Sequence, residues 1–442
     1  MKKEVLIFSE DFEGEEIDAK VWSHEVDMSG GGNRQFEVLV DKSENSFVKK
    51  GALHIKPSLV DNVLGLLDLG PECTASIDWM CKRRGDIENV LPPIQSARLN
   101  SKDKFAFKYG RIEFTARLPT SKWTWPALWL MPNDEVYGPW PRSGELDIME
   151  SRGNPPVYER KGEDMSNALA SATFHFGPDW LRDGYPLASE GSIPLENNET
   201  LADKMHVFGL YWTDTELYAY IDDRNKPFLK MDHYGARRLP ELGAEAGLWD
   251  TKDDWIPENA PLNAPFDQEF YIIMNLAIGG TSIGPKGTVH ETGYFPDHTA
   301  GKPWETYERF PQTSFHRNRQ EWLPSWTDDT ASITDNAALR VDNIKVWGFP
   351  SLTTVSTWDN NHKRHTKTIS NNHFLHTATI VFIAGASLLL TAAILTFRKV
   401  TQRNKTAGGG AVLGNNHNNK ATGYQALNVV DDKQLIATNG SS

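Results

Sequence analysis

The chain has 442 residues, a formal net charge of −13 and 39% hydrophobic residues, among them 15 Trp and 20 Phe. The acidic balance, with no basic stripe, argues against a nucleic-acid partner, and the apolar content is sufficient for a large buried core. The length permits two or three average domains, although single β-rich domains often run long.

The N-terminus, MKKEVLIFSEDFEG, lacks the features of a secretory signal peptide. Its apolar run, residues 5–8, is too short for the hydrophobic region of such a peptide and is followed by acids. We predict that these residues form the first strand instead. Because the rest of the sequence indicates export, we expect that the chain is incomplete at this end or that its first methionine is not the native start.

Short runs rich in β-branched and aromatic residues alternate with turn clusters along the chain, and helical periodicity is nearly absent. The clearest of these runs are FEVLV, ALHIKPSL, FAFKYGRIEFTARL, HVFGLYW, ELYAYI, EFYIIMNLAI and ALRVDNIKVW. Many short strands without clear helices predict an all-β jelly-roll sandwich of two antiparallel sheets.

Two cysteines, Cys73 and Cys81, lie in the loop PECTASIDWMC. No histidine accompanies them at metal-ligand spacing, which favours a small disulfide loop over a zinc site. Spacing alone leaves a disulfide and a pair of free thiols equally open.

The stretch ELDIME, residues 145–150, sets three carboxylates among apolar residues. Side chains on a strand alternate between faces, so Glu145 and Asp147 share a face. Glu150 breaks this alternation, and one β-bulge would return it to the face of the other two. A retaining glycosidase needs one carboxylate to attack the sugar and one carboxylic acid, about 5–5.5 Å away, to protonate the leaving oxygen. On spacing alone, the alternative is the solvated face of an ordinary amphipathic strand.

Aromatic residues flank this stretch, with Trp123, Trp125 and Trp129 before it and Tyr137 and Trp140 in a loop rich in Pro and Gly. Flat aromatic faces near paired acids suit sugar stacking, because a pyranose ring has an apolar face. We predict that the three upstream tryptophans bind substrate. Core packing is the alternative for each, above all for Trp129 inside the run ALWLM.

The sequence WPALWLMP followed by GELDIME resembles the signature of glycoside hydrolase family 16, in its laminarinase branch. The six-residue E-x-D-x-x-E form marks that branch, whereas lichenase-like members use five residues without the bulge. The resemblance covers residues 4–347. Its further segments are IFSEDFEG, GGGNRQFEVLV, SARLNSKDKFAFKYGRIEFTARLP, FGLYWTDTELYAYIDD, PFDQEFYIIMNLAIGG and ALRVDNIKVW. The segments KPWETY and RQEWLPSW resemble the animal members, the β-1,3-glucanases and the β-1,3-glucan-binding proteins of invertebrate immunity.

This resemblance implies a jelly roll whose concave sheet carries a cleft, and endo-acting, retaining hydrolysis of β-1,3-glucan. Glu145 would be the nucleophile and Glu150 the acid/base, while Asp147 would orient the nucleophile and help to keep a proton on Glu150. No cofactor is required for this chemistry. The alternative is a membrane-bound receptor of innate immunity that recognises glucan without cleaving it. Such relatives have typically lost one or more of the three acids, and this chain keeps all three.

Three further residues match positions that line the cleft in relatives: Asn33 in GGGN, Arg98 in SARLN and His175 in TFHF. His175 would serve as a proton-network or substrate contact. From the residues alone, a turn residue, a surface charge and a satisfied core histidine are the respective alternatives.

Family members also often bind one structural Ca²⁺ on the convex side, and the matching candidates here are Asp11, Gly51 and Asp342. Hard cations prefer oxygen ligands. Two scattered acids are a weak signal, and ordinary surface carboxylates are the alternative.

The composition changes after residue 350, which we predict to be the end of the domain that begins at residue 1. Residues 351–373 are rich in Ser, Thr and Asn and are predicted to form a flexible stalk. A single transmembrane helix is predicted over residues 374–397, because residues 377–397 are 21 uncharged, mostly apolar residues, enough to cross a hydrocarbon core of about 30 Å. Residues 398–442 are predicted to be a disordered cytoplasmic tail.

Positive charges that follow this span, including Arg398 and Lys399, favour a cytosolic tail and a domain outside the cell or in a lumen, at the plasma membrane. A glycosylation sequon at Asn198 fits that side of the membrane. An oxidising compartment, together with a similar cysteine pair in animal relatives, favours a disulfide between Cys73 and Cys81.

Overall fold

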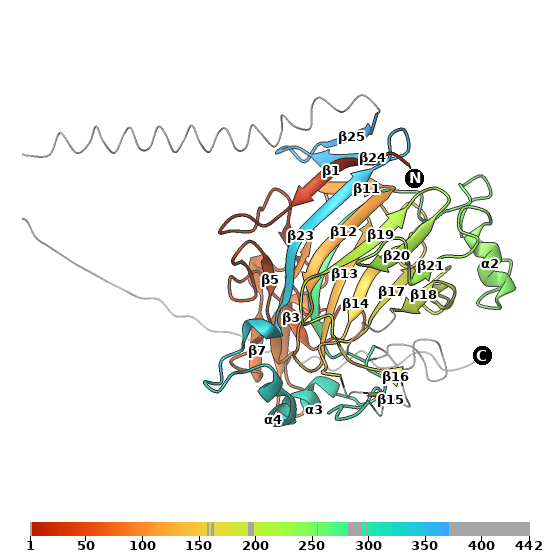
Figure 1. Cartoon of the computed structure of the whole chain (residues 1–442). Coiled ribbons are helices and arrows are strands. Elements are labelled where there is room, and N and C mark those ends of the chain that lie inside the picture. The colour runs from red at the N-terminus through yellow and green to blue at the C-terminus, as the bar shows by residue number, and fades with distance from the viewer. Residues whose placement is uncertain are drawn as a thin grey trace, which may run out of the picture. The chain divides into compact units, whose positions relative to one another are not determined.

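Two large antiparallel sheets form the body of the molecule in the computed structural model (Figure 1). The structure describes residues 2–156, 159–160, 163–192, 199–253, 255–281, 294–297 and 299–370. The predicted all-β sandwich is therefore confirmed, and three small sheets and a few short helices accompany it.

The first sheet has eight strands, in the order β21-β20-β19-β12-β23-β5-β4, with β1 paired to β23. The apolar N-terminal run forms β1, as predicted. The bounds are β1 Val5–Glu10, β4 Ser46–Val48, β5 Leu53–Ile55, β12 Gly110–Arg117, β19 His206–Trp212, β20 Leu217–Ile221, β21 Leu229–Lys230 and β23 Leu339–Gly348.

The second sheet has ten strands, in the order β18-β17-β14-β13-β22-β11-β24-β25, with β10 paired to both β22 and β2. It contains the three acids, on β14. The bounds are β2 Ser23–His24, β10 Arg98–Asn100, β11 Phe105–Lys108, β13 Thr124–Pro132, β14 Glu145–Ser151, β17 Ala170–His175, β18 Ser189–Gly191, β22 Phe270–Ile278, β24 Thr354–Trp358 and β25 Arg364–Thr368.

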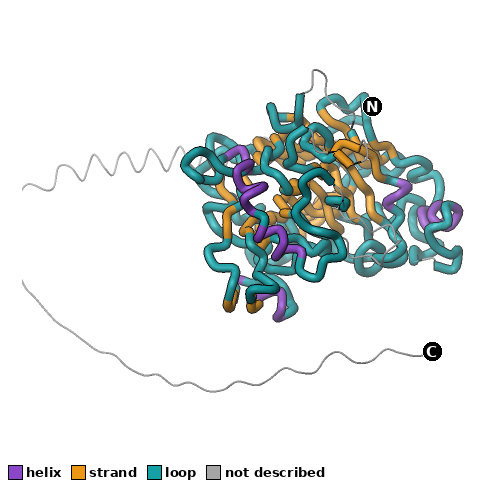
Figure 2. The backbone as a smooth tube through the Cα atoms, turned by 90° about the horizontal axis from the view of Figure 1, so that it is seen from below, coloured by secondary structure: helices purple, strands orange, loops and turns teal. Residues whose placement is uncertain are grey.

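The remaining elements are short, and Figure 2 shows helices and loops outside the strands of the sandwich. The small sheets are β15 Glu159–Arg160 with β16 Glu163–Asp164, β3 Glu37–Leu39 with β9 Ile94–Ser96 and β6 Ser58–Leu59, and β7 Gly65–Asp68 with β8 Lys82–Gly85. The α-helices are α1 Asp78–Cys81, α2 Leu239–Glu245, α3 Pro311–Arg317 and α4 Arg319–Trp322. The 3₁₀ helices are η1 Gly70–Glu72, η2 Tyr185–Leu187, η4 Leu323–Ser325 and η5 Asp335–Ala337.

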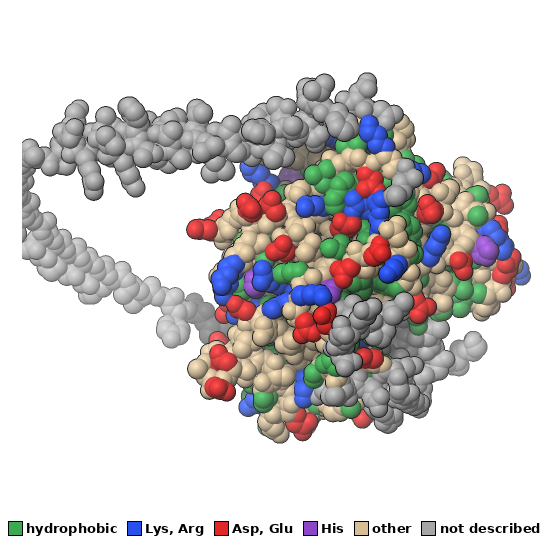
Figure 3. Space-filling view, viewed as in Figure 1, with side chains coloured by type: hydrophobic (Ala, Val, Ile, Leu, Met, Phe, Trp, Pro, Cys, Tyr) green, Lys and Arg blue, Asp and Glu red, His purple; other side chains and the backbone are tan. Residues whose placement is uncertain are grey.

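The main core lies between the two sheets and takes alternate residues from their strands. Leu128 and Leu130 of β13 and Leu146 and Ile148 of β14 are all buried there. Because side chains alternate along a strand, the intervening residues of β13 and the acids of β14 point to the opposite face of the ten-stranded sheet. On the outer surface seen in Figure 3, acidic and basic side chains are interspersed.

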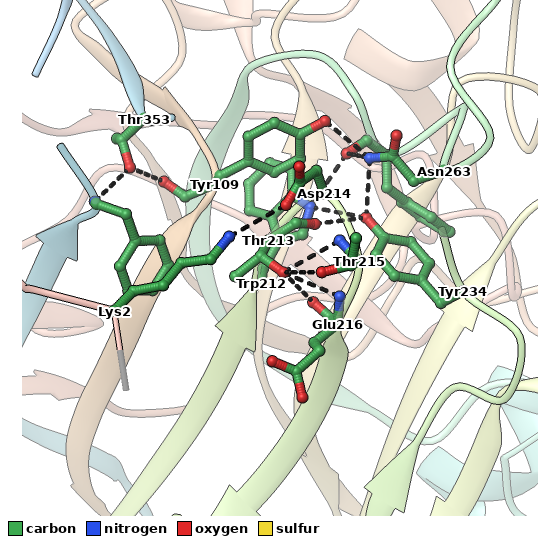
Figure 4. A network of polar contacts seen from close by, with 12 residues as sticks. Lys2, Tyr109, Trp212, Thr213, Asp214, Thr215, Glu216, Tyr234, Asn263 and Thr353 are labelled. Atoms are coloured by element: carbon green, nitrogen blue, oxygen red, sulfur yellow. Dashed lines mark hydrogen bonds and ion pairs between the residues drawn. The ribbon is translucent and has the colours of Figure 1, made fainter. Parts of the chain in front are cut away.

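A buried polar network joins the end of β19 to the loop before β22 (Figure 4). The amide nitrogen of Asn263 donates to the hydroxyls of Tyr109 (2.8 Å) and Tyr234 (3.2 Å). The indole of Trp212 donates to the same Tyr234 hydroxyl at 3.2 Å, and that hydroxyl donates to the Thr213 carbonyl at 3.1 Å. Each buried polar group thus gains a partner, which offsets its loss of water.

Replacement of Asn263 with Ala is expected to lower the free energy of unfolding by about 1–3 kcal/mol, because two buried tyrosine hydroxyls lose a partner. Chemical denaturation measures this change. Asn225, an exposed residue whose side chain contacts Asp223, is the matched control, and Asn225→Ala should leave stability nearly unchanged. Equal stability of the two variants would contradict the role of the network.

The structure corrects the prediction of a flexible stalk over residues 351–373. Residues 354–358 and 364–368 form β24 and β25, a hairpin whose first strand pairs with β11 and so extends the ten-stranded sheet. The Ser- and Thr-rich composition gave no signal of these strands, since β24 buries only Val355 and Ser356 and β25 is exposed throughout. Polar β-branched residues suit a sheet edge as well as a stalk.

The predicted disulfide is confirmed: Cys73 and Cys81 are bonded, with their Cα atoms 5.6 Å apart. No helix among the described residues is long and apolar enough to cross a membrane. The predicted span, residues 374–397, the tail after it and the sequon asparagine, Asn198, lie outside the described residues. They stay predictions.

Candidate active site

A β-bulge on β14 brings the three acids to one face of the sheet. Opposite β17, Asp147 pairs with Thr173 and Glu150 with Ser171, so β14 has one residue more than its partner between these pairs. The pairing of β14 with β13 shifts in register at the same place, between Asp147 and Met149. The extra residue is accommodated because Ile148 and Met149 are both buried in the core between the sheets. The bulge predicted from the spacing is therefore present.

Two indole groups hold the outer acids. The Trp140 indole N–H donates to the Glu145 carboxylate, and the Trp125 indole N–H donates to Glu150 Oε1 at 2.8 Å. Tryptophan donates without accepting, so each indole stabilises a carboxyl oxygen without competing for the proton.

His175 holds the middle acid. Its Nε2 lies 3.2 Å from Asp147, and its Nδ1 is bonded to Asp183, whose side chain is fully buried. Asp183 also accepts the backbone N–H groups of Phe176 and Tyr185. Burial opposes a charge on the imidazole, but the two aspartates outweigh it and raise the pKa of His175 well above its usual value. His175 is therefore an imidazolium between two carboxylates.

Burial is the main cause that raises the pKa of all three acids. The pKa of Glu150 is raised to about 7, against the lowering effects of His175 and of the Trp125 hydrogen bond. Burial, and then the charge on Asp147, raise the pKa of Glu145 to about 8, and burial and Glu150 raise that of Asp147. The three carboxyls are too close to ionise independently, so each pKa describes the coupled group of acids and not one residue alone.

From Glu150, one row of paired residues crosses the sheet. Glu150 pairs with Ala127, Ala127 with Asn275 and Asn275 with Arg98, on β14, β13, β22 and β10. Directly paired residues share a face, so Asn275 and Arg98 lie on the same face as the acids. The Arg98 side chain is 12% exposed and ion-paired with Glu25 at 3.2 Å, so it is not a freely solvated surface charge.

Trp129 lies on this face, two residues from Ala127. Its indole donates to Asn275 Oδ1 at 2.7 Å, and the Arg98 guanidinium lies 5.4 Å from its ring centroid. The side chain is only partly buried. A partly exposed, oriented ring beside the acids is a suitable platform for a sugar ring.

The structure gives Trp123 and Trp125 other positions than predicted. Trp123 is 1% exposed and packs edge-on against Phe295 and Trp304, so its prediction as a substrate contact is wrong. Trp125 is 7% exposed, and Tyr294 covers one face of its ring at a centroid distance of 4.1 Å. That face has no room for a sugar, and the main contact of Trp125 with the site is its hydrogen bond to Glu150.

Trp129→Ala is expected to weaken glucan use by about 1–2 kcal/mol, roughly 5–30-fold, while the fold is retained. The loss should appear in KM and in kcat/KM on short laminari-oligosaccharides. Trp347, partly buried on β23 of the other large sheet, provides the matched control as Trp347→Ala. Unchanged kinetics in a folded Trp129→Ala protein would remove the ring from the sugar path.

Asn33 lies in the turn before β3, and its carbonyl accepts a hydrogen bond from the Thr281 N–H, beyond the end of β22.

The strand pairing of the eight-stranded sheet brings the three calcium candidates toward one another. Asp11 follows the last pair of β1 with β23, Gly51 precedes β5, and Asp342 lies on β23 between its pairings with β5 and β1. Two carboxylates and a carbonyl fit a hard cation. Calcium beside β23, where β5 and β1 meet along that strand, stays a prediction.

Sequence reasoning did not assign Trp140, Asp183, Asn275 or Tyr294 to the site. Trp140 had a usable signal, since it lies five residues before Glu145 in an aromatic loop. Asp183 had none, because only the fold brings its loop against His175. Asn275 stands as a single polar residue in the predicted strand EFYIIMNLAI, which was a usable signal.

Residues 84–156 match a family model described as XgeA-like, catalytic GH16 domain. The β-1,3-glucan-binding protein of Penaeus monodon is 36% identical over 360 residues, covering 78% of this chain and 91% of its own length. The glucan endo-1,3-beta-glucosidase A1 of Niallia circulans is 31% identical over 289 residues, 63% of this chain and only 34% of its own length. The solved laminarinase of Rhodothermus marinus is 23% identical, with 79% of this chain and 99% of its own covered, at a TM-score of 0.46.

The fold and the site define a β-sandwich domain with three acids on one face of a sheet, Asp147 buried and Glu145 and Glu150 partly exposed. The chain belongs to glycoside hydrolase family 16, as its motifs predicted.

Proposed function

We propose that this chain hydrolyses β-1,3-glucosidic bonds within β-1,3-glucan, with retention of the anomeric configuration. The observation that carries the proposal is the bulge on β14, which sets Glu145, Asp147 and Glu150 on one face. A strand with a merely solvated acidic face has no need of a bulge, of burial or of two indole donors. The endo-acting mode rests on the name of the Niallia circulans relative.

In this proposal the Glu145 carboxylate attacks the anomeric carbon and forms a glycosyl ester, while Glu150 gives its proton to the departing glycosidic oxygen. Glu150, now ionised, takes a proton from water, which attacks the same carbon and releases Glu145. The Trp140 N–H would favour the ionised form of Glu145 before attack. Asp147, held by His175, sits between the two and disfavours ionisation of both at once.

The test is incubation of the full-length chain with laminarin, with reducing ends and product anomers followed by NMR. We expect new reducing ends, a rapid fall in chain length and β-anomers as the first products. Alpha-anomers formed first would exclude retention. Binding without release of sugar would exclude catalysis.

That last outcome corresponds to a second candidate function, recognition of β-1,3-glucan without cleavage. The specific observation in its favour is the name of the Penaeus monodon relative, a β-1,3-glucan-binding protein. The three acids favour catalysis, because a receptor has no use for a proton donor whose pKa is raised to about 7 at Glu150.

We further propose that the domain is anchored by one membrane span, residues 374–397, with the domain outside the cell or in a lumen. The support is the uncharged run 377–397 and the cations after it. The disulfide fits such a compartment.

Truncation after Asn372, which retains β24 and β25, is expected to release soluble protein, while the full chain partitions into detergent. Extraction with alkaline carbonate measures the difference, because it removes peripheral proteins and leaves spanning ones in the membrane. Recovery of the intact chain in the carbonate supernatant would contradict the anchor.

A further inference from the structure

A pocket of about 360 Å³ lies away from the three acids, and four arginines line it. They are Arg34, Arg83, Arg84 and Arg309, from the turn before β3, from β8 and from the segment before α3. None of the described residues that line the pocket is acidic. Four cations around one cavity are unexpected in a chain with a net charge of −13. The local charge therefore selects for an anion.

The guanidinium groups have carbonyls rather than carboxylates as partners. Arg34 donates to the Arg309 carbonyl at 3.1 Å, and Arg83 donates to the carbonyls of Trp79 and Met28. Burial lowers the pKa of Arg34 and, against the raising effect of Asp27, also that of Arg83, as expected for cations that are partly desolvated. Oxyanions match the planar donor fork of arginine and would supply the missing negative charge.

An exposed aromatic ring completes the pocket. Trp79 is 48% exposed on α1, between the two bonded cysteines, and the Arg83 guanidinium lies 4.6 Å from its ring centroid. The disulfide and the β7–β8 hairpin hold this segment in place. A flat ring beside guanidinium groups offers an apolar surface for a sugar together with charge for its substituent.

The pocket adjoins the far end of the row of residues that starts at Glu150. A Cβ placed on Gly31 would lie 3.0 Å from the Arg98 guanidinium, and Gly30 and Arg34 of the same turn line the pocket. Three steps between strands separate Glu150 from Arg98, roughly 14 Å. A glycan that lies along this row would reach the turn and then the pocket.

We propose that this pocket binds an anionic sugar unit, one that carries a sulfate ester or a carboxylate, on a glycan that extends from the cleft. Direct contacts would come from Arg84 and Arg309, whose side chains are exposed, and from the ring of Trp79. The inference rests on the proposed binding of glucan in the cleft. It adds a preference for acidic over neutral glucans.

The experiment compares three laminari-oligosaccharides of equal length, neutral, 6-O-sulfated and oxidised to the C6 carboxylate, by calorimetry on the full-length chain. We expect an anionic form to bind about tenfold more tightly than the neutral one, with the gain reduced by added salt. Arg84→Gln with Arg309→Gln should abolish the gain and leave neutral affinity unchanged. The control is Arg237→Gln, an exposed arginine beside α2 that pairs with Glu245.

Tighter binding of only one derivative would identify sulfate or carboxylate as the group that the pocket binds. Tighter binding of both would mean that the pocket binds anionic substituents in general. Equal affinity for all three oligosaccharides would overturn the inference, whether or not the chain cleaves laminarin. A gain that the double variant retains would also overturn it. If laminarin is not cleaved but the arginine-dependent gain remains, the inference stands and the proposed hydrolysis fails. Equal binding of a sulfated α-glucan would refute the link to the cleft.

Discussion

Glu145→Gln and Glu150→Gln are each expected to lower turnover of laminarin by several orders of magnitude while the fold is retained. Each substitution keeps the shape of the side chain and removes a chemical role that no neighbour replaces. Asp147→Asn should cost less, because Asp147 acts on its neighbours rather than on the sugar. Initial rates on laminarin measure all three. Full activity in either glutamine variant would exclude that residue from the chemistry.

Which glutamate plays which role needs a separate measurement. The pKa of Glu145 is raised to about 8 and that of Glu150 to about 7, an order opposite to the one that a nucleophile and an acid require. Protons are shared among the carboxyls of a coupled set, so the order of these two pKa values does not decide which glutamate is the nucleophile. The assignment rests instead on the positions of the two glutamates in the motif. The assignment of Glu145 as the nucleophile is the one that the resemblance of ELDIME to the E-x-D-x-x-E pattern implies, and it stays a prediction.

Azide with an aryl β-laminaribioside distinguishes the two roles, because the aryl group leaves without a proton. In Glu150→Ala, azide should replace the attacking water and give the β-glycosyl azide. In Glu145→Ala, azide should attack the substrate directly and give the α-glycosyl azide. Opposite anomers would reverse the roles of the two acids.

The strands and the positions of the acids could be predicted from the sequence, because both depend on the order of residues within a single strand. Alternation along β13 and β14 predicts which side chains are buried, and the spacing of Asp147 and Glu150 already requires the bulge. The residues that hold the acids could not be predicted in this way. Asp183 reaches His175 through a loop, and nothing in its own segment indicates a partner.

Composition misled the prediction where one pattern suits two structures. Trp123 and Trp125 were both assigned to sugar binding, yet Trp123 is in the core and Trp125 is stacked on Tyr294. Trp123 lies in the turn before β13 with a φ of 67°, so the alternation of a strand does not place its side chain, whereas Trp125 is on β13 and is covered by Tyr294. The hairpin of β24 and β25 was hidden for a related reason, since polar β-branched residues are typical of both edges and linkers.

His175→Gln is expected to lower kcat/KM on laminarin by about 10²–10³-fold, because it removes a partly buried cation from among the carboxyls of the site. Asp183→Asn leaves the imidazole in place but removes one of the two carboxylates that keep it charged. Burial then favours neutral imidazole, and the acids lose the positive charge that lowers their pKa values. Asp183 is therefore a positioning residue that acts through His175.

The pH profile separates this electrostatic role from a merely structural one. The charge on His175 lowers the pKa of every acid in the set, so its loss should move both limbs of the profile of kcat/KM to higher pH, by about one unit for each 1.4 kcal/mol of interaction lost. Asp179→Asn, in the same loop but paired with exposed Arg182, is the matched control and should move neither limb. A lower rate in Asp183→Asn with unmoved limbs would mean that Asp183 only supports the loop through its backbone hydrogen bonds. In His175→Gln, a shift to lower pH would contradict a charged His175, because loss of an imidazolium makes neighbouring carboxyls harder to ionise. In Asp183→Asn, a shift to lower pH would instead mean that the imidazole keeps its charge, because the Asp183 carboxylate itself raises the pKa of Glu145.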